Sequence, residues 1–69
     1  MNRDLNQTER DQIESIIDDT SVKALLEALS DICGAKSEHV DSNWQDSATA
    51  RVWAYAAGVT GAASTDVNV

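Results

Sequence analysis

The side chain best suited to metal chemistry in this sequence is its one histidine. His39 would need a second ligand three or four residues away to form a metal site on a helix. Those positions hold Ala35, Lys36, Ser42 and Asn43. None of these is a usual metal ligand, so we interpret His39 as a solvated side chain and predict no metal site.

The one cysteine is the other candidate for chemistry. Cys33 could act as a nucleophile only beside a base, in a partly open and electropositive setting. His39 follows six residues later, so the two side chains point in different directions on one helix. We interpret Cys33 as a small buried apolar residue. The sequence also has no glycine-rich phosphate loop, CxxC pair, calcium loop or nucleophile elbow. It therefore predicts a protein that is not an enzyme and needs no cofactor.

Acidic residues dominate the charge, with twelve acids against five bases and a net charge of −7. The clusters Glu9/Asp11/Glu14 and Asp18/Asp19 could hold a cation, but they are explained more simply as solvated helix faces and caps. Negative charge disfavours direct binding to nucleic acid or an anionic membrane. A helix-turn-helix DNA binder would also need a basic recognition helix. The charge fits simple solubility first, then a basic protein partner or mimicry of a polyanion.

The strongest structural signal lies between Val22 and Val40, where two stripes recur at helical spacing. One stripe is apolar and the opposite one is acidic, which predicts a helix over about residues 21–40 with one packed and one solvated face. The apolar stripe contains Val22, Leu25, Leu26, Leu29, Ile32, Cys33 and Val40, and the acidic stripe contains Glu27, Asp31 and Glu38.

Shorter helices are predicted on both sides of this one. Three isoleucines, Ile13, Ile16 and Ile17, form the contact face of a helix over about 9–18 that starts after Thr8. The polar run 18–21 favours a break, and a continuous helix through it is the alternative because no glycine or proline enforces the break. A third helix is expected over about 47–57, after a turn near 41–46, with its end near Gly58.

The third predicted helix is apolar on nearly all sides. Such a helix is buried on two sides or forms an interface. In a chain of 69 residues, we expect one side to meet another subunit. The candidate self-association residues are Trp53, Ala50, Ala54 and Ala57.

The predicted fold is all-α, as a small three-helix bundle or an open helical arrangement completed by homodimerisation. Residues 1–7 are expected to form an N-terminal arm, 8–59 a single helical domain and 60–69 a flexible C-terminal tail. Large apolar residues are few, and a single cysteine cannot form an intramolecular disulfide. Oligomerisation is the stabilising device that remains for so small a domain.

The expected location is the cytoplasm. Met1 is followed by polar residues instead of the apolar core of a signal peptide. No run approaches the roughly 18 apolar residues of a membrane span, so no membrane partner is expected. The lone Cys33 is consistent with a reducing compartment.

These features predict a small acidic protein-interaction module of unknown pathway, without enzymatic activity. The candidate partner contacts are Trp44 as an aromatic anchor and Glu27, Asp31 and Glu38 as acids that steer a basic protein. The alternative for Trp44 is a cap on the open end of the core. The alternative function is an acidic inhibitor or regulator that mimics nucleic acid and binds a basic protein groove. Acids clustered on one face would favour this alternative, and scattered acids would favour the interaction module.

Overall fold

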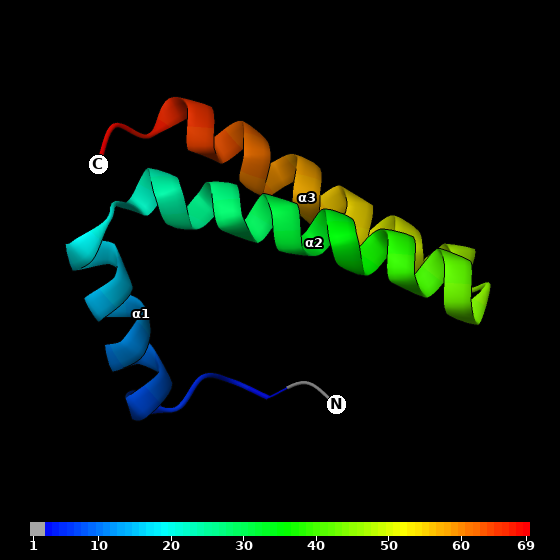
Figure 1. Ribbon diagram of the computed structural model, residues 1–69, viewed down its shortest axis with the longest axis horizontal. Coiled ribbons are helices and arrows are strands. Elements are labelled where there is room, and N and C mark those ends of the chain that lie inside the picture. The colour runs from blue at the N-terminus through cyan, green and yellow to red at the C-terminus, as the bar shows by residue number, and fades with distance from the viewer. Residues whose placement is uncertain (1–2) are drawn as a thin grey trace.

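The computed structural model describes residues 3–69 and contains three helices joined by short turns (Figure 1). The helices are α1 (Gln7–Asp19), α2 (Val22–Trp44) and α3 (Ser47–Asp66). The side chain of Trp44 lies outside the described part of the chain. The prediction of an all-α fold is confirmed for the described residues.

A complete capping box begins α1. The side chain of Asn6 accepts a hydrogen bond from the Glu9 N–H at 2.8 Å, and the Glu9 carboxylate accepts one from the Asn6 N–H at 2.9 Å. This reciprocal pair satisfies two backbone donors that the helix itself leaves free. The helix therefore begins at Gln7 after the Asn6 cap, slightly before the start predicted after Thr8.

The junction between α1 and α2 is hydrogen-bonded from both sides. The Thr20 N–H donates to the carbonyl oxygens of Ile16 and Ile17, and the Thr20 hydroxyl also donates to Ile16. Ser21 caps α2 by accepting from the Ala24 N–H at 2.9 Å. The break predicted in the run 18–21 is confirmed, and the continuous helix is excluded.

Helices α2 and α3 form an antiparallel hairpin and lie side by side along their length (Figure 1). Gln45 ends α2 in the left-handed conformation, with φ 53° and ψ 34°. Asp46 then caps α3 by accepting from the Thr49 N–H at 3.1 Å. Helix α1 contacts α2 but not α3, which makes the molecule flat, with extents of 38 × 28 × 14 Å. The open arrangement is thus the predicted alternative that the structure adopts.

The pairing of α2 with α3 repeats every seven residues along both helices, as in a coiled coil. Three donors on α2 reach three main-chain carbonyl oxygens on α3. They are Lys23 Nζ to Ser64 at 2.6 Å, Ser30 Oγ to Ala57 at 2.8 Å and Ser37 Oγ to Ala50 at 2.8 Å. Only small residues on α3 allow the backbones to approach closely enough for these bonds. We call this line of contacts the seam.

The apolar stripe predicted for α2 is divided between two directions. Leu26, Cys33 and Val40 are partly buried beside the seam. Leu29 and Ile32 are 37% and 53% exposed, because helical periodicity places them about 100° and 160° round α2 from Ser30, which faces α3. The expectation that the whole stripe packs on one side is therefore wrong for the single chain.

The end predicted for the third helix near Gly58 is also wrong. Helix α3 continues to Asp66, and Ser64 near its end is buried against the start of α2. The Lys23 N–H also donates to the carbonyl oxygen of Val69 at 2.8 Å. Residues 60–66 are helical where a flexible tail was expected, because their small side chains extend the seam.

Two glycines of α3 provide a matched test of the seam. A Cβ added at Gly58 meets no atom within 4 Å, whereas one at Gly61 would lie 3.0 Å from Ser30 Oγ. We expect Gly58→Ala to raise the free energy of unfolding by about 0.5–1 kcal/mol, because alanine restricts the unfolded chain. Gly61→Ala should lose this gain, since the hydroxyl that it crowds is held by Ala57. Urea unfolding followed by circular dichroism measures both variants, and equal gains would contradict the close approach of the helices.

Candidate interaction surfaces

The α2–α3 hairpin has two broad sides with different chemistry. On one side, Lys36 of α2 lies over Trp53 of α3, with Nζ 5.9 Å from the ring centroid. On the other, Glu38, Asp41 and Arg51 are among the residues that line a shallow groove between the helices. These contacts orient both helices, and helical periodicity then assigns the exposed residues to one side or the other.

The side marked by Lys36 carries large apolar groups that the single chain leaves uncovered. We call it the apolar side, and its members are Leu29, Ile32, Lys36 and Trp53. Val52 is 67% exposed and Val59 is 49% exposed, but both lie at least about 100° round α3 from Trp53, on the outer surface of that helix. Lys36 is the one charged member of this set, and it lies amid the apolar residues.

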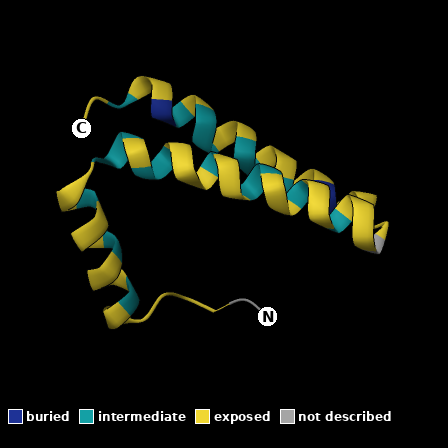
Figure 2. Cartoon of the chain, in the orientation of Figure 1, coloured by how far each residue is buried: buried dark blue, intermediate teal, exposed yellow. Residues whose placement is uncertain are grey.

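The single chain encloses very little of its surface. Among the residues whose burial is described, only Ala50 and Ser64 are buried, and Figure 2 shows exposed residues along all three helices. The chain has an accessible surface of 5382 Å². A folded monomer of 7.4 kDa is expected to expose about 4,200 Å². The chain therefore exposes roughly 1,200 Å² more surface than a folded monomer of its mass is expected to expose.

The acids predicted to contact a partner are exposed on α2, away from the apolar side. Glu27, Asp31 and Glu38 keep the solvated positions that the sequence pattern indicated. Lys23 Nζ lies 3.9 Å from the Glu27 carboxylate, and Arg51 lines the same groove as Glu38. Glu27 and Glu38 therefore each have a basic side chain nearby. Trp44, the predicted aromatic anchor, ends α2 with its backbone, and its side chain lies outside the described part.

The predicted self-association residues are divided by the structure. Ala50 is buried and Ala57 is half-buried against α2 of the same chain, where their carbonyl oxygens accept the seam hydrogen bonds. The expectation that these two alanines face another subunit is corrected, because α2 already covers them. Trp53 is half-buried beneath Lys36, and Ala54 is exposed. Sequence reasoning missed Leu29 and Ile32 as interface candidates, because it assigned the whole apolar stripe of α2 to the core.

His39 and Cys33 take ordinary positions on α2. His39 is exposed, and its Nδ1 lies 3.0 Å from Asn43 Nδ2. Cys33 is a partly buried free thiol on a different side of the helix. Within residues 3–69, no three His, Cys, Asp or Glu side chains are grouped as metal ligands would be. In the same range, no helix combines the length and apolar content required to cross a bilayer.

Comparison of the chain with family models, with curated proteins and with solved structures finds no match.

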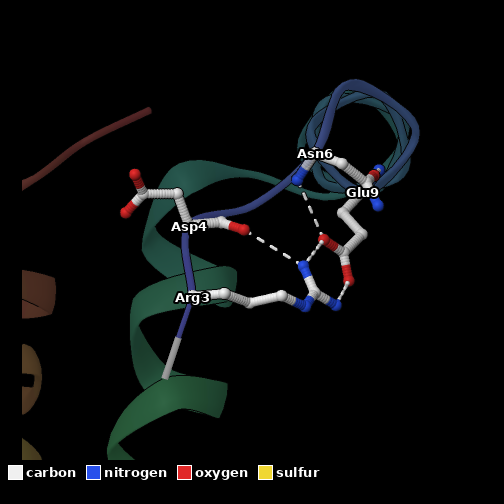
Figure 3. A network of polar contacts seen from close by, with 4 residues as sticks. All are labelled: Arg3, Asp4, Asn6 and Glu9. Atoms are coloured by element: carbon white, nitrogen blue, oxygen red, sulfur yellow. Dashed lines mark hydrogen bonds and ion pairs between the residues drawn. The ribbon is translucent and has the colours of Figure 1, made fainter. Parts of the chain in front are cut away.

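A bidentate ion pair anchors the segment that precedes α1. Arg3 Nη1 and Nη2 each lie 2.7 Å from one carboxylate oxygen of Glu9, and Nη1 also donates to the Asp4 carbonyl (Figure 3). The guanidinium, assisted by the Asn6 N–H, lowers the pKa of Glu9 to about 2. The same pairing raises the pKa of Arg3. Charge at this position therefore links the arm to the first turn of α1.

The Glu9 carboxylate should remain ionised far below its usual pKa of 4.5. A lowered folded-state pKa stabilises the helix start above pH 4.5, and this contribution is lost as the pH falls toward 2. NMR titration of the Glu9 carboxyl carbon measures the value directly. Arg3→Gln should raise the pKa toward 4.5, and Arg10→Gln, with the same loss of charge, should leave it low. An ordinary Glu9 pKa in the parent chain would contradict the ion pair.

Proposed function

We propose that this protein is a small non-enzymatic interaction module that works as a homodimer, with the apolar side covered in the assembly. The uncovered surface is the observation that carries this proposal. Standard interfaces bury about 800 Å² on each partner. The excess of roughly 1,200 Å² per chain is of the size that a second copy would remove from water.

The weakness of the single chain's packing supports the same conclusion. The seam is built from alanine, serine and a lysine, so it buries little apolar area. Burial contributes roughly 25 cal/mol per Å² of apolar surface. Covering Leu29 and Ile32 would supply stabilisation that the seam does not. Domains below about 70–80 residues commonly need such a device.

A basic protein is the external partner that we propose for the dimer. Glu27, Asp31 and Glu38 lie away from the apolar side and stay available when that side is covered. Together with the net charge of −7, they would speed the approach of a basic surface. Lys23 lies beside Glu27 and Arg51 lines the same groove as Glu38, so the acids do not form an unbroken anionic surface, and this favours the interaction module over a mimic of nucleic acid.

The homodimer is tested by sedimentation equilibrium of the full chain at micromolar concentration. We expect a two-copy mass for the parent and at least about a tenfold weaker association for Ile32→Lys, because the variant would bury a second positive charge beside Lys36. Gly34→Lys is the matched control. It adds the same charge on the acidic side, where a Cβ meets no atom within 4 Å. A folded parent that stays monomeric, or equal weakening by both variants, would overturn the proposal.

The basic partner is tested by affinity purification from the native host with mass spectrometric identification. The bait is the parent chain or a variant with Glu27→Gln, Asp31→Asn and Glu38→Gln. We expect the variant to keep its two-copy mass and to lose the basic partner, with salt weakening capture by the parent. Capture of the same basic protein by both baits would place the contact elsewhere.

A further inference from the structure

Helix α1 is an amphipathic helix that packs only lightly on the rest of the chain. Its isoleucines, Ile13, Ile16 and Ile17, share one side, where Ile13 and Ile17 are partly buried and Ile16 is 49% exposed. Figure 1 shows α1 extending away from the hairpin, and it makes no contact with α3. A helix of 13 residues is marginal in water by itself. The single chain therefore covers its isoleucine side only in part.

The corner between α1 and α2 keeps α1 away from its own hairpin. Thr20 donates hydrogen bonds to the carbonyl oxygens of Ile16 and Ile17 in α1. The Ser21 hydroxyl accepts one from the N–H of Ala24 in the first turn of α2. These two residues are the whole connection, and each is bonded only within its own helix. In the structure this corner directs α1 away from the hairpin (Figure 1). The observed direction of α1 therefore leaves the apolar side of the same chain open to another copy.

Charge decides which part of the other copy fits. If two hairpins paired directly through their apolar sides, each would bring a Lys36 ammonium into the interface without an acid from that side. Burying an unpaired charge is costly. Helix α1 carries five acids and one base, and Glu14 and Asp18 follow Ile13 and Ile17 along one edge of the isoleucine side. Docked α1 would therefore bring counter-charges to Lys36.

We propose that α1 of each copy docks on the apolar side of the other copy's hairpin, so that the homodimer is held by exchanged helices. This inference rests on the proposed function and names the segment that covers the apolar side. The two-fold symmetry of a dimer makes the same contact twice. Helix α1 is about 20 Å long, enough to reach past Leu29, Ile32 and Lys36 on the hairpin.

Disulfide cross-linking between differently tagged copies tests the exchange. In a Cys33→Ala background, copies with Ile16→Cys are mixed with copies with Ile32→Cys and oxidised. Disulfides require Cα atoms within about 7 Å, so we expect the mixed product to exceed either like-with-like product by at least about fivefold. Asp31→Cys is the control for Ile32→Cys, since it lies next in sequence on the acidic side, and it should give no mixed product.

The sedimentation mass of the reduced variants separates the possible outcomes. A two-copy mass with Ile32→Cys cross-linked mainly to itself would overturn the exchange, leave the homodimer standing and show that hairpins pair directly. A monomeric parent would overturn both proposals.

A charge exchange provides a second test that needs no cysteine. Lys36→Glu should weaken association about tenfold, and adding Glu14→Lys should restore most of that loss. Circular dichroism of each variant confirms that the helices are retained. An unchanged association constant in Lys36→Glu would overturn the role given to charge, and with it the preference for α1 as the occupant.

Discussion

The hydrogen bonds from α2 side chains to α3 carbonyl oxygens set the geometry on which the rest of the structure depends. A serine hydroxyl is short, so it reaches a carbonyl on a neighbouring helix only if the two backbones lie close together. Ser30 and Ser37 therefore require small residues opposite them, and the chain places Ala57 and Ala50 there. Lys23 completes the same register at the far end of the hairpin by reaching Ser64.

This close approach has a consequence for the large apolar side chains. A seam lined by alanine and serine has no room for leucine or isoleucine, so Leu29 and Ile32 lie outside it. Each seam hydrogen bond contributes only about 1 kcal/mol net. The seam thus defines the register of the two helices strongly and supplies little hydrophobic stabilisation. Folding and association would be linked in such a molecule, because a second copy binds only the folded hairpin.

The separation of the two sides of the hairpin also bears on function. The apolar side has a single charged member, Lys36, whereas Glu27, Asp31 and Glu38 project from α2 on the solvated surface. A homodimer that uses the apolar side leaves these acids free for another protein. Association and partner binding would then use different residues of the same helix, and a substitution in one surface would leave the other in place.

The amino-acid sequence by itself determined the number of helices, the break at 18–21 and the amphipathic character of α2, because caps and periodicity act within a few residues. Only the tertiary structure decided which residues of α2 face α3. Leu29 and Ser30 are neighbours in the sequence. Apolar periodicity alone predicts that the leucine faces α3, yet it is the serine that does, because its hydroxyl donates to a carbonyl oxygen there. The extent of α3 was decided in the same way. Gly58 resembles a helix end locally, but the contacts of Lys23 with Ser64, distant in sequence, stabilise the helix beyond that point. Interactions between residues far apart in the chain leave no local pattern, and they determined which apolar residues the single chain leaves exposed.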